Sequence, residues 1–396
     1  MNFLSSFDVL LITNPTNIRY LTGFVGVAEH ERESYLLIFA DQAYLFTNSL
    51  YREQVRNLKL LNCYIVELLK TKNQLKTVEI SREESFAKKL AEILKRSHLA
   101  SQGETLQGVR LGFEEDDLKV SEYNAFSKVL KGITLIPTKN RIEKLRMIKR
   151  EDEIDNIRKA ARLTDKCFEY IVGKLKPRAT EAEIAWEIEA FIRKNGSELA
   201  FSPIVTFNAH SSQPHYLSMN HEPLTMDSLV LLDLGARVNG YCADMTRVVF
   251  IGKPKNEWLR AYETVLTAQL EALNSLIRHS RAGGNPGNKD SGSRIKSGMT
   301  EPLSGAALDQ LARTIIKEAG YPPYSHSLGH GVGLAIHEAP RLTHKKNVVL
   351  KSGMVITVEP GIYIEGQYGI RIEDLVLLKE EGIEILSKTD KNIKIL

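Results

Sequence analysis

The sequence predicts two domains, an α/β domain followed by an α+β domain, and three observations support this. Its 396 residues exceed the usual length of a single domain. In the first part, apolar strands such as "FDVLLIT", "SYLLIFA" and "QAYLFT" accompany the helical spacing of "SFAKKLAEILKRSHLA". A long amphipathic helix then begins at "REDEIDNIRKAARLTDKCFEYIVGKL". We therefore place the boundary near Asn140, which gives domains at 1–140 and 141–396.

The second domain is expected to contain two similar halves. A second helix follows Pro177, where Thr180 and Glu183 form a capping box and Gly196 ends the helix. After a set of strands come helices at "EWLRAYETVLTAQLEALNSLI" and "GAALDQLARTIIKEAG", and then strands through "GMVITVEPGIYI" and "GIRIEDLVLL". The order helix, helix, strand pair therefore occurs twice, which indicates two related halves that close on each other.

A segment near residues 278–302, "RHSRAGGNPGNKDSGSRIKSGMTEP", separates the third and fourth helices of this domain. Its composition cannot bury enough apolar surface to order itself, so we interpret it as a flexible surface insertion. The alternative is a contact with nucleic acid or a partner protein through its basic side chains. These are Arg278, Arg281, Lys289 and Arg294.

Composition and charge exclude several classes of protein. A net charge of +4 is small for this length, so neither nucleic acid nor a membrane is expected as a partner. Cys63, Cys167 and Cys242 lie far apart, which favours core thiols in a reducing compartment over a disulfide framework. The N-terminus lacks a basic leader, and no apolar run approaches the roughly 18 residues that span a bilayer. We therefore expect a cytoplasmic protein.

Two aspartates interrupt the apolar runs of "LLDLGARVNGYCADMTR", residues 231–247. Between them, Asn239-Gly240 is a strong hairpin signal, because a type I′ turn needs positive φ at both central positions. Counting back from this turn places Gly235 opposite Asp244, with Asp233 two residues further along the same face. The two aspartates are then diagonal neighbours about 7 to 8 Å apart, and both can reach metal ions separated by about 3.5 to 4 Å.

A second pair of carboxylates is predicted in "VEPGIYIEGQYGIRIED". A short loop centred on Gly366 places Glu359 opposite Glu373, although Pro360 and Gly361 can distort this register. Four carboxylates that converge in a partly buried site repel one another unless cations neutralise them. Two divalent ions would supply the compensating charge.

A glycine-rich segment, "HSLGHGVGLAIHE", adds His326, His330 and His337 where the backbone can approach a ligand closely. One imidazole with four carboxylates suits Mn²⁺, Co²⁺, Fe²⁺ or Zn²⁺ better than a thiolate-preferring ion. Each feature alone has a simpler explanation, because most acidic residues in strands face solvent or form salt bridges. A single histidine in such a loop is likewise usually structural. Together, the three features favour a dinuclear metal site.

These motifs, in this order, resemble the metal-binding motifs of the metallopeptidases that share the pita-bread fold with methionine aminopeptidase. The resemblance rests on "DLGARVNGYCADMTR", "HSLGHGVGLAIHE", "VEPGIY" and "GIRIED" and covers residues 140 to 390. The N-terminal "NPTNIRYLTGF" and the joining "IEKLRMIKREDEI" are similar to the prolidase and aminopeptidase P branch. Chains of that branch carry an extra N-terminal domain, so the resemblance implies a creatinase/prolidase-like domain before the pita-bread domain.

The resemblance implies metal ligands at five positions. Asp233 would bind one of two ions, and His330 with Glu359 would bind the other. Asp244 and Glu373 would bridge both ions. The implied cofactor is two divalent ions per chain, with Mn²⁺ first and Co²⁺, Zn²⁺ or Fe²⁺ as alternatives.

The same resemblance implies roles for side chains around the metal site. His215 in "SQPHY" and His337 in "AIHE" match histidines that contact the scissile carbonyl and assist proton movement. His326 matches another pocket histidine, and Arg371 matches an arginine that supports the site through hydrogen bonds. Among the carboxylates, Glu359 is the candidate proton shuttle.

The implied activity is hydrolysis of the peptide bond between an N-terminal residue and a following proline. A peptide with proline at the second position is the implied substrate, and a homodimer is the implied assembly. Whether the enzyme is a dipeptidase or an aminopeptidase is left open by the sequence. Two alternatives are a metal-free pita-bread module that binds peptides or proteins, and a metal-free hydrolase resembling creatinase. Five intact ligand positions oppose both.

Overall fold

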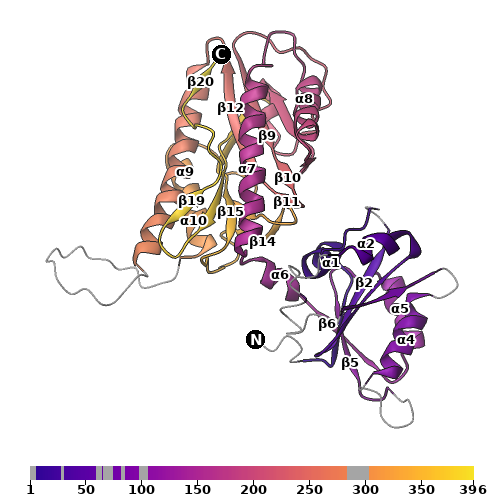
Figure 1. Ribbon diagram of the computed structural model, residues 1–396. Helices are drawn as coiled ribbons and strands as arrows, with labels where there is room; N and C mark the ends of the chain where they lie inside the picture. The colour runs from indigo at the N-terminus through magenta and orange to yellow at the C-terminus, as the bar shows by residue number, and fades with distance from the viewer. Residues whose placement is uncertain are drawn as a thin grey trace. The chain divides into compact units, whose positions relative to one another are not determined.

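The chain forms two compact units in the computed structural model, Met1–Leu145 and Arg146–Leu396 (Figure 1). The structure describes residues 6–27, 31–58, 65, 75–81, 85–97, 106–282 and 303–396. The division falls at the end of the short helix α6 (Arg141–Arg146), a few residues after the predicted boundary at Asn140. Among the described residues, no helix combines the length and the apolar character needed to cross a membrane.

A mixed six-stranded sheet organises the first unit. Its strands, in spatial order, are β4 (Leu75–Glu79), β3 (Ala43–Thr47), β2 (Ser34–Ile38), β1 (Val9–Ile12), β5 (Arg110–Glu114) and β6 (Thr134–Thr138). The described helical segments are α1 (Pro15–Thr22), η1 (Ser49–Tyr51), α2 (Arg52–Arg56), α4 (Phe86–Arg96) and α5 (Val120–Val129). In α4, Phe86, Leu90 and Leu94 recur every four residues and are buried in the core that includes the sheet. The predicted α/β character of this part is confirmed.

The described part of the second unit contains four long helices. They are α7 (Glu151–Val172), α8 (Glu181–Lys194), α9 (Asn256–Ala282) and α10 (Gly305–Glu318). The predicted capping box of α8 is present, because Thr180 Oγ1 accepts from the Glu183 amide at 3.2 Å and Glu183 Oε2 accepts from the Thr180 amide at 3.0 Å.

The insertion predicted near residues 278–302 begins later than expected. Helix α9 continues through Ala282, so the first residues of that segment are helical. No helix-breaking residue occurs before the Gly-Gly pair at 283–284, which explains why the helix extends so far. The rest of the segment, residues 283–302, lies outside the described residues.

Two sheets form the centre of the second unit. One has the order β20 (Lys394–Ile395), β12 (Met245–Ile251), β9 (Ser228–Leu234) and β8 (Ile204–Phe207). The other has the order β14 (Glu338–Leu342), β13 (Gly329–Gly331), β15 (Val355–Val358), β18 (Asp374–Leu378) and β19 (Ile383–Ile385). Smaller sheets join β11 (Tyr241–Cys242), β10 (Ala236–Val238) and β7 (Glu198–Leu199), and β16 (Gly361–Ile364) with β17 (Tyr368–Arg371).

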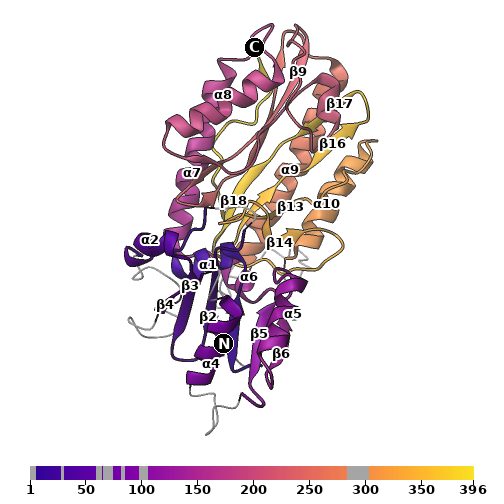
Figure 2. The same ribbon diagram turned by 90° about the vertical axis from the view of Figure 1, so that its right-hand side faces the viewer.

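The two halves of this unit repeat one arrangement, as the sequence predicts. Helices α7 and α8 precede the antiparallel pair β9 and β12, and helices α9 and α10 precede the antiparallel pair β15 and β18. Figure 2 shows α7 and α8 on one side of the strands and α9 and α10 on the other. Together with the first unit, this is the predicted α/β plus α+β architecture.

Apolar cover on both faces makes β9 a fully buried strand. Leu229 and Leu231 belong to the core cluster of α9 and α10, whereas Val230 and Leu232 belong to the cluster of α7 and α8. The carboxylate of Asp233, which lies in this strand, is therefore largely buried from water.

The described cysteines are core thiols, as the sequence predicts. Cys167 and Cys242 are buried free thiols, as expected, whereas Cys63 lies outside the described residues.

Candidate active site

The aspartate pair has the register that the hairpin turn predicts. Asn239 and Gly240 have φ values of 51° and 89°, as a type I′ turn requires. The strands that follow keep one register, from Val238 opposite Tyr241 to Thr246 opposite Asp233. This count places Gly235 opposite Asp244, and a Cβ on Gly235 would lie 2.1 Å from the Ala243 carbonyl oxygen. Glycine is therefore required where the strands approach most closely beside Asp244.

The glutamate pair also has its predicted register. Val358 pairs with Asp374, and on the other side of the glutamates Gly361 pairs with Arg371. Glu359 and Glu373 lie between these two pairs, so they stand opposite each other across the β15–β18 hairpin. Gly366, at the centre of the intervening turn, has a φ of 67°. Pro360 does not displace the register, because the antiparallel count is the same before and after it.

A cavity of about 910 Å³ in the second unit contains the predicted site. All nine predicted site residues line it. They are His215, Asp233, Asp244, His326, His330, His337, Glu359, Arg371 and Glu373. The structure therefore brings together residues from both halves of the unit, separated by up to 158 positions in the chain, from His215 to Glu373.

His330 directs one ring nitrogen at the carboxylates. Its Nε2 lies 3.3 Å from Glu359 Oε1 and 3.6 Å from Asp244 Oδ2. Its Nδ1 lies 3.1 Å from the Gly331 carbonyl oxygen, which can only accept, so we assign the ring proton to Nδ1. Burial lowers the pKa of His330 to about 3, with His337 contributing, so the ring is neutral near pH 7. The lone pair of Nε2 then faces carboxylate oxygens.

Two further histidines complete this side of the cavity. The rings of His330 and His337 pack edge to face, with centroids 4.4 Å apart. His326 Nε2 lies 3.0 Å from the hydroxyl of Tyr363. Burial, followed by the charge of Arg371, lowers the pKa of His326 to about 4. Burial also lowers the pKa of His337, with help from Arg341 and His215. Neutral imidazoles therefore line the cavity near pH 7.

The four carboxyl groups lie close to one another, three of them buried and Glu359 part-buried, which raises their pKa values. Burial is the main cause for each, and neighbouring carboxylates add to it at Asp244 and Glu373, whose pKa values rise well above the usual range. The pKa of Glu359 rises to about 7 through burial, and that of Asp233 rises despite Arg371. A protein without cations would therefore hold protons at this site near neutral pH.

Arg371 supports the carboxylates with three separate donors. Its Nη2 donates to Asp233 Oδ2 at 2.6 Å, its Nε donates to Thr246 Oγ1 at 2.9 Å, and its Nη1 donates to the Tyr363 hydroxyl at 2.9 Å. The guanidinium is buried, so these contacts fix the orientation of the carboxylate.

The donor set fits divalent cations. Asp244, His330 and Glu373 each offer a ligand atom within 4.8 Å of the others. Asp233 Oδ1 is buried and has no hydrogen-bond partner among the residues that the structure describes. An orphaned carboxylate oxygen and an imidazole lone pair aimed at carboxylates both gain a partner if cations bind between them. One nitrogen and several carboxylate oxygens suit a hard or borderline divalent ion.

Sequence reasoning missed several residues that support the site. Tyr363 lies between His326 and Arg371, and Thr246 donates to Glu373 Oε2 at 2.6 Å. Thr246 is two residues after Asp244 and therefore on the same face of its strand, which is a signal that could have identified it. Tyr363 alternates with apolar residues in "GIYI" and carries no comparable signal.

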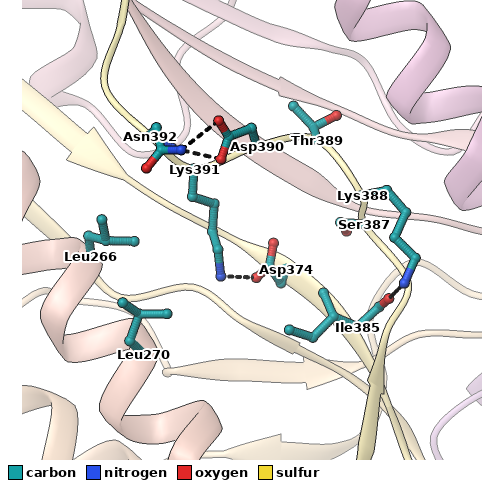
Figure 3. A pocket seen from close by; sticks show the side chains of 10 residues that line it. All are labelled: Leu266, Leu270, Asp374, Ile385, Ser387, Lys388, Thr389, Asp390, Lys391 and Asn392. Carbon is teal, nitrogen blue, oxygen red and sulfur yellow. Dashed lines mark hydrogen bonds and ion pairs between the residues drawn. The ribbon is translucent and has the colours of Figure 1, made fainter.

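A second cavity, of about 440 Å³, is lined by a different set of residues around the C-terminal segment (Figure 3). Lys391 Nζ donates to Asp374 Oδ2 at 2.5 Å, and Asp374 Oδ1 accepts from Arg247 Nη2 at 2.8 Å. Arg247 Nη1 also donates to the carbonyl oxygen of Glu373. These contacts bind the charged groups to one another, so this network supports the start of β18 next to Glu373.

Comparisons with known proteins agree with this geometry, and the fold and site together define a peptidase with the pita-bread fold. Residues 155–380 match metallopeptidase family M24, and residues 5–148 match the creatinase/prolidase N-terminal domain. The chain belongs to metallopeptidase family M24. The predicted family and fold class are thereby confirmed.

Relatives named as peptidases that act at Xaa-Pro cover nearly the whole chain. A Xaa-Pro dipeptidase of Pyrococcus furiosus is 32% identical over 392 residues, which are 98% of this chain and 96% of that protein. The structure of a Xaa-Pro dipeptidase from Bacillus anthracis has a TM-score of 0.81 at 32% identity, covering 100% of this chain and 98% of that one. An X-Pro aminopeptidase from Thermotoga maritima has a TM-score of 0.79 at 30% identity, with 98% of each chain covered. These relatives support peptidase activity.

Proposed function

We propose that this protein hydrolyses the peptide bond between an N-terminal residue and a following proline at a dinuclear metal site. The observation that carries the proposal is the convergence of three buried carboxylates, the part-buried Glu359 and His330 on one cavity, with Asp233 Oδ1 lacking a partner among the described residues. Similarity to dipeptidases and an aminopeptidase that act before proline supports the substrate class.

The ligand roles follow the donor geometry and the family resemblance. Asp233 would hold one ion with Oδ1, while its Oδ2 is bound to Arg371. His330 and Glu359 would hold the other ion, with Asp244 and Glu373 between the two. We propose Mn²⁺ as the ion, with Co²⁺, Zn²⁺ or Fe²⁺ as alternatives that this donor set also accepts.

Divalent cations supply, when bound at such a site, an acidic water and Lewis-acid polarisation of a carbonyl oxygen. The chain's own residues supply orientation and proton transfer. Glu359 would accept a proton from the nucleophile and return it to the leaving imino nitrogen of proline. His215 and His337 line the same cavity and donate hydrogen bonds toward the scissile carbonyl.

Arg341 bears on the choice between dipeptides and longer substrates. Arg341 lines the same cavity and is an exposed residue. A free carboxylate placed near the scissile bond, as in a dipeptide, would pair with it. We therefore propose that Xaa-Pro dipeptides are the preferred substrates. The implied homodimer stays a prediction, which sedimentation would test.

A metal-free binding module is the alternative function. It gains nothing from four clustered carboxyl groups, whose pKa values are all raised. Metal analysis of the purified protein separates the two functions, because the proposed enzyme retains or takes up two ions per chain.

The decisive experiment is an assay after loading with Mn²⁺ or Co²⁺. Three peptides are compared, namely Xaa-Pro, Xaa-Pro-Yaa and a proline-free dipeptide of the same N-terminal residue. We expect cleavage of the Xaa-Pro dipeptide at the highest kcat/KM. Cleavage of the proline-free dipeptide as fast as the Xaa-Pro dipeptide would contradict the proposed specificity. A metal-loaded protein that cleaves none of the three peptides would contradict the proposed activity.

A further inference from the structure

A buried ion cluster lies next to the catalytic cavity and takes no part in the metal site. Glu338 Oε2 accepts from Arg146 Nη2 at 2.5 Å, and Glu338 Oε1 accepts from Lys149 Nζ at 2.7 Å. The three side chains are 6%, 7% and 1% exposed, respectively. We call these residues the Glu338 cluster. Arg146 and Lys149 belong to the motif "IEKLRMIK", to which the proposed reaction assigns no role.

Stability alone is a weak reason for such a cluster. Removing two cations and a carboxylate from water costs several kcal/mol per ion, and an apolar replacement of similar volume is often equally stable. A buried ionic group that fixes one arrangement of the chain is a better-attested use. The position of Glu338 indicates that the cluster fixes the segment around His337.

Glu338 directly follows His337 and begins β14, which pairs with the strand β13 that carries His330. Its backbone pairs with Gly331, at a point where the register of β13 and β14 shifts between His330 and Gly331. This irregularity changes the direction in which the side chains on either side of it point. It lies where the rings of His330 and His337 pack 4.4 Å apart.

The chain also folds closely around the Glu338 carboxylate. A Cβ on Gly333 would lie 2.4 Å from Glu338 Oε1, so the loop before His337 passes against the carboxylate. Within that loop the Gly333 amide donates to Ala335, and the Gly333 carbonyl accepts from the Cys242 amide. The Glu338 carboxylate therefore packs against the start of the loop that leads to His337.

Lys149 connects the cluster to the strand that leads to Glu359. Its amide donates to the Gly353 carbonyl oxygen at 2.8 Å, in the turn before β15. Gly353 has a φ of 83°, and a Cβ there would lie 2.9 Å from Ile148, so this turn is closely packed. Lys149 therefore contacts both Glu338, which follows His337, and the turn before the strand that leads to Glu359.

We propose that Glu338 is a positioning residue that fixes the His337 ring in the cavity, with Arg146 and Lys149 as its anchors. The proposal rests on the proposed function, because His337 is assigned there to the scissile carbonyl. Displacing a positioned group by about 1 Å costs on the order of 10²-fold in rate. Loss of the Glu338 charge therefore lowers kcat and leaves the metal ligands in place.

The test compares Glu338→Gln with Glu384→Gln in the metal-loaded enzyme, using a Xaa-Pro dipeptide. Glu384 forms a similar carboxylate pair with Arg158 at 2.9 Å but is partly exposed and lies outside the cavity, so it is a matched control. We expect kcat of Glu338→Gln to fall about 10- to 100-fold, with KM and metal stoichiometry unchanged. Glu384→Gln should keep the wild-type kcat.

A double-mutant cycle tests whether Glu338 acts through His337. In a His337→Ala background, Glu338→Gln should reduce kcat further by less than about threefold, because the group it positions is gone. An equal loss in both backgrounds, or a wild-type kcat in Glu338→Gln, would overturn the proposal. If Glu338→Gln does not fold, Glu338→Asp and Lys149→Met, which each remove part of the cluster, take its place in the same cycle.

A second readout does not depend on activity. In protein labelled at histidine, the NMR signals of the His337 ring should shift in Glu338→Gln, whereas those of His344, bound to Asp309, should not. Unchanged His337 signals would contradict the positioning role even if the wild-type protein proved inactive. An inactive wild type with shifted His337 signals would instead contradict the proposed function and leave the positioning role supported.

Discussion

Thr246 Oγ1 donates to Glu373 Oε2 at 2.6 Å, and this contact joins the two halves of the catalytic unit. Thr246 lies in β12 of the first half, while Glu373 precedes β18 of the second. The Glu373 amide also donates to the Thr246 carbonyl oxygen at 3.2 Å. Both residues are buried, so the orientation of a proposed bridging carboxylate depends on a hydroxyl group from the other half.

Replacement of Thr246 by valine should therefore weaken the metal site while preserving the packing. Valine has nearly the shape of threonine but cannot orient Glu373, and loss of a partner that orients a ligand typically costs 10- to 100-fold in metal affinity or activity. Thr246→Ser, which keeps the hydroxyl, is the matched control. Titration with Mn²⁺ and the kcat of each variant check the prediction. A valine variant that equals the serine variant would contradict it.

Asp244→Asn should abolish turnover and leave the fold largely intact. Between two cations the site requires a full negative charge, which an amide lacks. The neutral amide also removes one of the repelling buried carboxylates, so the metal-free protein should not lose stability. Metal stoichiometry should fall with activity. A variant that kept two ions per chain and the wild-type rate would be incompatible with the dinuclear site.

The registers of both carboxylate pairs were predictable because each depends on a short turn. Asn239-Gly240 and the turn around Gly366 set the pairing of their strands, and the period of two along a strand places the acidic side chains. That the two halves close on each other could be inferred only from the repeated order of helices and strands. The family resemblance was needed to assign His215, which stands in an irregular segment after η3 (Asn208–Ser212).

Contacts between distant segments could not be predicted from local pattern. Glu338 contacts Arg146, 192 positions earlier, and Tyr363 contacts His326, 37 positions earlier. Nothing in their own neighbourhoods distinguishes Glu338 and Tyr363 from ordinary strand residues. The end of α9 was also misplaced. Polar composition indicated an irregular segment, but charged residues such as Arg278 are good helix formers and prolong a helix until glycine follows.

The raised pKa of Glu359 predicts a pH dependence in the metal-free protein. Burial raises this pKa from 4.5 to about 7, so the folded state holds the proton more tightly than the unfolded state. The contribution of Glu359 to the free energy of unfolding is fully present below pH 4.5 and is lost as the pH rises through 7. This loss amounts to about 3 kcal/mol. In EDTA, the free energy of unfolding of the wild type should therefore fall relative to Glu359→Gln between pH 4.5 and 7.

Glu384→Gln is the control for this pH dependence. The hydrogen bond from Arg158 lowers the pKa of Glu384 to about 2, so its contribution is lost only as the pH falls below 4.5. Between pH 4.5 and 7 the difference between this variant and the wild type should stay constant. Chemical denaturation at several pH values measures both differences, and a constant Glu359→Gln difference would refute the raised pKa.

His215 offers a test that separates substrate recognition from metal binding. It lines the cavity with the proposed ligands but is not among the three residues whose ligand atoms lie within 4.8 Å of one another. If it hydrogen-bonds near the scissile bond, His215→Ala should lower kcat by about 10² to 10⁴ and retain both ions. In the wild type, replacing proline by alanine in the peptide should cost most of kcat/KM, because a site shaped for the tertiary amide and its ring loses fit and orientation. Metal analysis with steady-state kinetics checks both effects, and loss of ions from His215→Ala would show that His215 is a ligand instead.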